Sequence, residues 1–263
     1  KGPTEFDIHS SDKSWVDSPA WRIIHALATM TSKDGNKILI DGWYDNVKPP
    51  SKEDLELIDK LVETLDEETI KHEMKVNRFI NDLHGKELLI QYLYSTTLNI
   101  NGIWGGYIGP GSKTVLPHKV TVKMDTRLVP DQSSEEVISK IRKHLDKHGY
   151  TDITIRSLDP YEWSKTSVKE PIVQATIQAY RKLRYEPEIW PHHASSVPYH
   201  LFNRSPIHLP FCDGGLGHGA RAHAPDEYLV IEGNEKVAGL AGCEKSFVAI
   251  LDAYASYTQK QTS

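Results

Sequence analysis

The stretch Lys119-Val-Thr-Val-Lys-Met-Asp-Thr-Arg-Leu128 alternates apolar and polar side chains. Because successive side chains of a strand point to opposite faces, the stretch predicts a half-buried β-strand. One face consists of Val120, Val122, Met124, Thr126 and Leu128. Arg127 belongs to the other face, so its guanidinium is expected to point away from the apolar core.

Segments on both sides of this strand predict helices and further strands. Ser133-Ser-Glu-Glu136 is a capping box that opens a helix, and Gly149 is expected to end it. Ser18-Pro19 places a capping serine before a proline at the first helical position, which predicts a second helix. Strands are expected at 5–9, 38–44, 98–103 and 151–156. Without residues 38–95 the order is strand, helix, strand, strand, helix, strand, which is typical of a ferredoxin-like α+β domain.

Residues 45–95 carry a helical pattern of their own. Ser51 is expected to cap a helix whose apolar residues recur at helical spacing, namely Leu55, Ile58, Val62 and Leu65. Further helical pattern is expected at 76–83 and at 88–93. We therefore predict a first domain at 1–157 that contains a helical insertion at about 45–95.

After residue 158 the pattern changes. A helix is expected from Pro171, short strands at 189–190 and 207–211, and a final helix at 234–257. Strands separated by helices favour an α/β layer, although this segment is small for a complete sheet. The fold class predicted for the whole chain is therefore α/β, with an α+β domain at 1–157 and part of an α/β domain at 158–263.

Composition limits the classes of function. The 263 residues are 38% hydrophobic and 25% charged, with a net charge of −5, so there is no electrostatic case for nucleic acid or an anionic membrane as partner. Two cysteines are too few for a disulfide framework, which predicts a reducing, cytoplasmic location. No apolar run is long enough to span a bilayer, and no signal peptide is expected. The chain begins at Lys1, which is compatible with a processed product, a fragment or part of something longer.

A glycine-rich stretch carries the candidate metal chemistry: Gly214-Gly-Leu-Gly-His-Gly-Ala-Arg-Ala-His-Ala-Pro-Asp-Glu227. An imidazole in such a loop is a suitable metal ligand, and Asp226 or Glu227 would be placed to orient it. The alternative is a surface loop whose two histidines are simply solvated.

The glycine-rich run followed by His-Ala-Pro-Asp-Glu resembles the C-terminal metal-ligand motif of the M20 family of zinc peptidases. That family includes carnosinase-like dipeptidases, carboxypeptidases and deacetylases. Further motifs follow in the family's order, at 7–11 (Asp-Ile-His-Ser-Ser), 35–44, 111–117 (Gly-Ser-Lys-Thr-Val-Leu-Pro) and 126–130 (Thr-Arg-Leu-Val-Pro). The resemblance therefore extends across nearly the whole chain.

The resemblance implies an architecture and a cofactor. Residues 1–157 would be a lid, or dimerisation, domain inserted into a catalytic domain, of which 158–263 would be the C-terminal part. The intact active site would hold two zinc ions, with manganese or cobalt as alternatives, and His223 would be a zinc ligand. Two copies would form a homodimer through the lid.

The resemblance also assigns roles to four further residues. His9 would reach into the partner's active site and stabilise the tetrahedral intermediate. Thr114 and Arg127 match residues that bind the substrate's carboxylate or scissile group, and Ser196 matches a substrate-contacting serine. Judged without the family, the favoured interpretation of His9 is a surface histidine at a strand end. Arg127 then lies on a solvated face, and Ser196 is a helix N-cap.

The function implied is zinc-dependent hydrolysis of the amide bond of dipeptides or short peptides. The family's His-x-Asp motif and its Glu-Glu pair are not found, since Glu67-Glu68 and Glu135-Glu136 are interpreted as solvated charge. A two-metal hydrolase needs several ligands and a base, so the isolated chain is expected to be inactive. The alternatives are an inert dimerisation fragment, or a deacetylase or desuccinylase of N-acyl amino acids.

Overall fold

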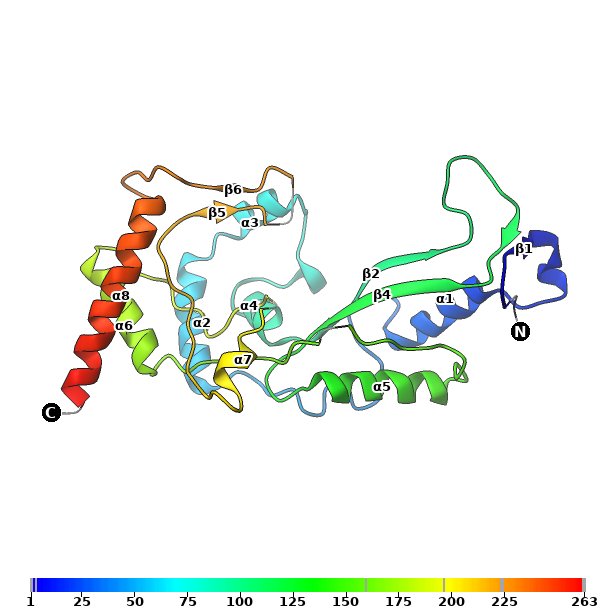
Figure 1. The fold of residues 1–263 in the computed structure, drawn as a ribbon, viewed down its shortest axis with the longest axis horizontal. Coiled ribbons are helices and arrows are strands. Elements are labelled where there is room, and N and C mark those ends of the chain that lie inside the picture. Colours follow the sequence, from blue (N-terminus) through cyan, green and yellow to red (C-terminus); the bar gives the residue numbers. More distant parts are fainter. Residues whose placement is uncertain (1, 3, 159, 196, 223–224, 262–263) are drawn as a thin grey trace. The chain divides into compact units, whose positions relative to one another are not determined.

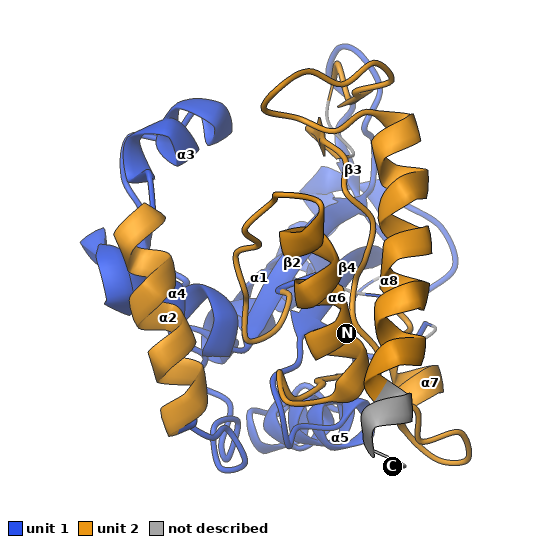
Figure 2. Cartoon of the chain, turned by 90° about the vertical axis from the view of Figure 1, so that its left-hand side faces the viewer, with its two compact units in different colours: residues 1–51, 65–163, 194–197 blue, residues 52–64, 164–193, 198–263 orange. Residues whose placement is uncertain are grey.

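The computed structural model describes residues 2, 4–158, 160–195, 197–222 and 225–261. Its contacts divide the chain into two compact units, shown in Figure 2. The first comprises residues 1–51, 65–163 and 194–197, and the second comprises 52–64, 164–193 and 198–263. The domain boundary near residue 158 stays a prediction.

Two long antiparallel strands form the sheet of the first unit. They are β2 (Thr97–Gly105) and β4 (Val120–Arg127), and Figure 1 shows them side by side. Both were predicted from their alternation, and both are confirmed.

A bulge interrupts the pairing of β2 with β4. The register moves from Ile100↔Met124 directly to Gly102↔Lys123, so the intervening residue Asn101 has no partner in the ladder. As a result, the residues of β2 on the same side as Arg127 carry odd numbers before the bulge and even numbers after it.

Two helices pack with the sheet. They are α1 (Pro19–Met30) and α5 (Ser134–Lys147). Their predicted caps are present, because the Ser18 hydroxyl accepts the Trp21 N–H at 3.4 Å and the Ser133 hydroxyl accepts the Glu136 N–H at 3.2 Å. The buried core of this unit consists of Ala26, Met30, Ile38, Ile40, Trp43, Val137 and Leu145, and Leu98 and Met124 from the strands pack against it.

Two predicted strands of the first unit are wrong as strands. At 38–44 the chain makes a single bridge, Thr31↔Ile38, and then turns. At 151–156 it forms no strand, although Ile153 and Ile155 pack on the core. In extended backbone, successive side chains point to opposite sides whether or not a neighbouring strand pairs with it. The pattern therefore predicted correctly which side chains are buried, but not the strand pairing. The predicted mixed α/β class is confirmed.

The rest of the first unit is made of short elements. These are β1 (Ile8–His9), η1 (Ser10–Ser14), α3 (Glu67–Met74), η2 (Ile80–Asp82), α4 (Gly85–Tyr94) and β3 (Val115–Leu116). The helix predicted at 76–83 is wrong, because Lys75, Asn81 and Asp82 adopt positive φ values of 55°, 52° and 53° that end helical geometry. The helix predicted at 88–93 lies within α4.

The second unit is mainly helical. Its elements are α2 (Lys52–Thr64), α6 (Pro171–Lys182), α7 (His200–Asn203), β5 (Gly219–Ala220), β6 (Tyr228–Leu229) and α8 (Leu240–Gln261). Helix α6 packs against α8, with Ala175, Ala179 and Ile250 buried. Among the described residues, no helix has the length and apolar character needed to cross a bilayer.

Three predictions for the second unit are wrong. The segments 189–190 and 207–211 form no strand. The last helix begins at Leu240 rather than near 234, because the Asn234 side chain accepts the backbone N–H groups of Lys236 and Val237 at 2.8 and 3.0 Å. Such a local turn competes with helix formation.

Candidate functional site

Two of the candidate residues, His9 and Thr114, lie together. Strand β1 pairs with β3 in the register Ile8↔Leu116 and His9↔Val115, and the pairing continues as the Ser10 N–H donates to the Thr114 carbonyl at 3.1 Å. This ribbon brings His9 Nε2 to 3.2 Å from Thr114 Oγ1. Both side chains are exposed.

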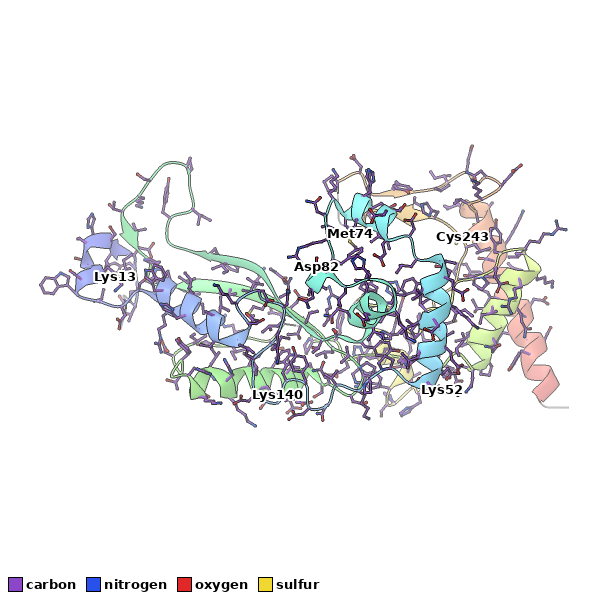
Figure 3. The ribbon with its side chains drawn as sticks, turned by 180° about the vertical axis from the view of Figure 1, so that it is seen from behind. Lys13, Lys52, Met74, Asp82, Lys140 and Cys243 are labelled. Atoms are coloured by element: carbon purple, nitrogen blue, oxygen red, sulfur yellow. The ribbon has the colours of Figure 1, made fainter. Side chains whose placement is uncertain are left out.

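The surroundings of His9 select one form of its neutral ring. Nδ1 accepts the Ser11 backbone N–H at 3.2 Å and lies 2.7 Å from the Ser11 hydroxyl. A backbone N–H can only donate, so Nδ1 is the acceptor and Nε2 carries the proton. The Nε2–H is therefore a donor directed towards the Thr114 hydroxyl. The same side chain caps η1, the turn in which Lys13 is labelled in Figure 3.

A second histidine lies beside this ribbon. Asp7 Oδ1 accepts both the backbone N–H of His118 at 2.9 Å and its ring Nδ1–H at 2.7 Å. The backbone hydrogen bond from His118, and then its side-chain hydrogen bond, lower the pKa of Asp7. Sequence reasoning missed His118, because nothing in the alternation of apolar and polar residues indicates that His118 would form hydrogen bonds with Asp7.

Arg127 lies at the other end of the sheet. It pairs with Thr97, and its Nε is 3.6 Å from Asp125 Oδ2. Strand β4 runs from Val120 to Arg127, roughly 23 Å at the usual rise per residue, and Figure 1 shows β1 beyond the Val120 end. One chain therefore does not bring Arg127 together with His9.

A polar surface hollow of about 660 Å³ surrounds Arg127. It is lined by Thr97, Leu98, Asn99, Asn101, Asp125, Thr126 and Arg127. Asn99 Nδ2 donates to Asn101 Oδ1 at 2.7 Å and to Asp125 Oδ1 at 3.2 Å, which holds the acidic side of the hollow. The hollow thus offers a guanidinium, a carboxylate and amide groups to a polar ligand.

Ser196 and His223 lie outside the described residues, so their assignments stay predictions. Near His223 in the sequence, His218 Nε2 is 2.9 Å from the Tyr228 hydroxyl, and Asp226 Oδ2 is 3.9 Å from Arg221 Nη1. The described part of the chain contains no group of three or more His, Cys, Asp or Glu side chains able to hold a metal ion. These donors therefore do not fit a two-zinc centre.

Glu67 and Glu136 are not the solvated charges that were expected. Glu67 accepts the His84 ring Nδ1–H and the Gly85 N–H, each at 2.6 Å, at the N-terminus of α4. The backbone bond from Gly85, and then the side-chain bond from His84, lower the pKa of Glu67. Glu136 forms an ion pair with Lys140 and accepts from Asn46 at 2.8 Å. Both carboxylates make defined local contacts that hold parts of the fold together.

The mixed α/β unit with its short ribbon is a dimerisation domain of peptidases. The family model described as "Peptidase dimerisation domain" matches residues 5–153, which is more than half of the chain. The chain belongs to this M20 dimerisation-domain family.

Two kinds of curated dipeptidase are similar to about half of the chain. Beta-Ala-His dipeptidase of Rattus norvegicus is 31% identical over 142 residues, which are 53% of this chain and 28% of the relative. Cys-Gly metallodipeptidase DUG1 of Saccharomyces cerevisiae is 29% identical over 147 residues, which are 56% of this chain and 30% of the relative. The match thus spans less than a third of each relative's length.

Solved structures extend the similarity to both units. The M20 family metallo-carboxypeptidase Sso-CP2 from Sulfolobus solfataricus matches with a TM-score of 0.78 at 26% identity, over 97% of this chain and 60% of that one. Human carnosine dipeptidase 1 matches with a TM-score of 0.66 at 24% identity over 78% of this chain, which is a likeness of fold.

Proposed function

We propose that this chain is the lid and C-terminal portion of an M20-type metallopeptidase that hydrolyses the amide bond of dipeptides or short peptides. The support is the family match, together with curated relatives that are named as dipeptidases. The remaining part of the catalytic domain would supply the ligands that the described residues lack.

The observation that carries the proposal is the convergence of His9 and Thr114. His9 Nε2, which carries the proton of the neutral ring, lies 3.2 Å from Thr114 Oγ1 on the exposed ribbon of β1 and β3. When an amide carbonyl becomes tetrahedral, its oxygen gains negative charge, and preorganised donors stabilise that charge. We assign His9 Nε2–H to this role, with Thr114 orienting the ring or donating beside it.

Arg127 would bind the substrate's free carboxylate. A guanidinium recognises a carboxylate through two parallel hydrogen bonds, and the hollow around Arg127 is open to a ligand of dipeptide size. Since His9 lies beyond the opposite end of β4, one active site would take Arg127 from one copy and His9 from its partner. The proposal therefore includes a homodimer formed through the lid.

Zinc is the metal we propose for the intact site, with manganese or cobalt as alternatives, and His223 is the proposed ligand. Bound metal would supply Lewis-acid chemistry. Elemental analysis of the purified protein tests this part, with about two metal ions per chain expected for an intact site.

Substitution of His9 tests the proposed chemistry. In the complete polypeptide of this protein, His9→Ala is expected to lower kcat for dipeptides by about 100-fold or more, the usual effect of losing one oxyanion donor. The control is His25→Ala, an exposed histidine of α1 that stacks on Trp21. Unchanged hydrolysis by His9→Ala would refute the assignment.

Mixing two impaired variants, assayed with a free-carboxylate dipeptide well below KM, tests whether His9 acts across the dimer. A mixed dimer of His9→Ala and Arg127→Ala protomers has one site with both residues intact. Random exchange of subunits should then restore about one quarter of the activity, because about half of the dimers are mixed. No recovery after proven exchange would show that His9 and Arg127 do not serve one site in trans.

A non-catalytic dimerisation module is the second candidate. It is favoured by one observation, namely that the family model covers the dimerisation domain alone. A dimeric protein without bound metal and without hydrolysis of any dipeptide would support this candidate over the peptidase.

A further inference from the structure

The ribbon that carries His9 is very short. Strands β1 and β3 contribute two residues each. A two-stranded ribbon of this length is at best marginally stable by itself, so other contacts must hold its register. Those contacts decide whether His9 stays beside Thr114.

Backbone pairing ends at Ile8↔Leu116, the last pair of the ribbon. Because the Ser10 N–H donates to the Thr114 carbonyl and hydrogen-bonded pairs alternate along an antiparallel ladder, the next N–H directed towards β1 belongs to His118 and not to residue 117. The Asp7 carboxylate accepts this N–H of His118 at 2.9 Å, together with the ring Nδ1–H at 2.7 Å. Asp7 thus closes the end of the ribbon that the backbone leaves open.

Asp7 and His9 lie on the same side of the ribbon. They are two residues apart in extended backbone, so their side chains point to one face, and His118 meets that face through Asp7. A slip of one residue in the pairing would move His9 by about 3.3 Å along β3, which is enough to separate its ring from Thr114. Fixing the register at Asp7 therefore fixes the position of the His9 ring.

We infer that Asp7 and His118 are positioning residues, which hold the two-residue ribbon in the register that keeps His9 Nε2 against Thr114. The catalytic consequence rests on the proposed function, whereas the structural part does not. Neither residue contacts substrate in this proposal.

The simplest competing explanation is an ordinary surface pair of little energetic value. Exposed ion pairs contribute little to stability, because water and salt screen them. The same unit offers a matched pair for comparison, because Glu67 also accepts a histidine Nδ1–H and a backbone N–H, those of His84 and Gly85. This second pair lies at the start of α4 and not on the ribbon, so it controls for the loss of such a pair in general.

Amide hydrogen exchange measures how well the hydrogen bonds of this register are protected. The reporter is the Ser10 amide, which donates to the Thr114 carbonyl. In Asp7→Ala we expect its exchange to be about tenfold faster or more, by loss of local protection. His118→Ala should cause a smaller increase, because the backbone N–H of residue 118 still donates to Asp7. In Glu67→Ala, exchange should accelerate at Gly85 and stay unchanged at Ser10. A Ser10 rate in Asp7→Ala within about twofold of the parent protein overturns the inference.

Activity of the complete protein supplies the second readout. Asp7→Ala is expected to lower kcat by about tenfold, because His9 is no longer held at the position of the developing charge. Added to His9→Ala, the Asp7 substitution should have no further effect, since it acts through His9. If Asp7→Ala lowers kcat by the same factor in the parent protein and in the His9→Ala variant, the inference is contradicted. If His9→Ala hydrolyses dipeptides normally, the proposed function fails, and the Ser10 exchange rate still decides the structural role of Asp7.

Discussion

Gln132 ties the start of α5 to the core of the first unit, and its truncation gives a sharp test of that packing. The side chain is 2% exposed. Its Oε1 accepts the Val129 N–H at 3.2 Å, and its Nε2 donates to the Trp43 carbonyl at 3.1 Å. The amide thereby connects the end of β4 with the turn that carries Trp43, the largest fully buried side chain of the unit.

The expected loss of unfolding free energy in Gln132→Ala follows from the backbone groups that lose their hydrogen-bond partners. One backbone donor and one backbone acceptor lose their partners, and Val129 and Trp43 are themselves only 4% and 1% exposed. Leaving a buried polar group without a hydrogen bond costs about 1–3 kcal/mol, so the two together predict a loss of about 2–6 kcal/mol. For a unit of this size that corresponds to a fall in Tm of about 4–24 °C.

Urea unfolding followed by tryptophan fluorescence and circular dichroism measures the loss. Gln178→Ala is the matched control, because Gln178 is exposed on α6. Gln132→Glu should destabilise at least as strongly at neutral pH, because a buried carboxylate oxygen would face the Trp43 carbonyl oxygen without a donor between them. If Gln132→Ala unfolds within about 0.5 kcal/mol of the parent protein, as surface substitutions do, the reasoning is refuted.

Three further outcomes are expected. Arg127→Ala should raise KM for dipeptides with a free carboxylate by about 10-fold or more and leave C-terminally amidated substrates unaffected, in steady-state assays of the complete protein. Burial, and then the neighbouring His148, lower the pKa of His144, so the unfolded chain binds a proton that the folded chain excludes. Stability should therefore be fully present above the ordinary pKa of 6.5 and fall as the pH drops towards the folded value, and His144→Gln should flatten that slope in urea titrations. Ser133→Ala, which removes the cap of α5, should cost about 1 kcal/mol in the same titrations.

The sequence allowed the prediction of elements whose signals are local. The alternation at 120–127 and the serine caps at 18 and 133 depend on neighbouring residues, and all three are confirmed. The strands expected at 38–44 and 151–156 depended on pairing with a distant segment. Alternation reports which side chains are buried but says nothing about whether a partner strand is available.

The candidate site was predictable only in part for the same reason. His9 and Thr114 came from the resemblance to a family, and their contact depends on a pairing of two residues per strand, which has no periodic signal. His118 was missed because its contact with Asp7 lies where the pairing of β1 with β3 ends, a position that is known only once the register is known. The roles assigned to all five candidate residues stay predictions, namely those of His9, Thr114, Arg127, Ser196 and His223.

The bulge at Asn101 also determines where the chain tolerates a change of length. Beyond it, Trp104 pairs with Thr121 and Ile103 pairs with Val122. Deletion of Asn101 would leave all these pairs in place, so an alignment gap at this position preserves the pairing of β2 with β4 and removes only the contact with Asn99 at the hollow. A gap within 120–127 would instead exchange the two sides of β4 and turn Met124 outward and Arg127 inward. Homologous chains should therefore vary in length at the bulge and keep a constant length in the strand that faces it.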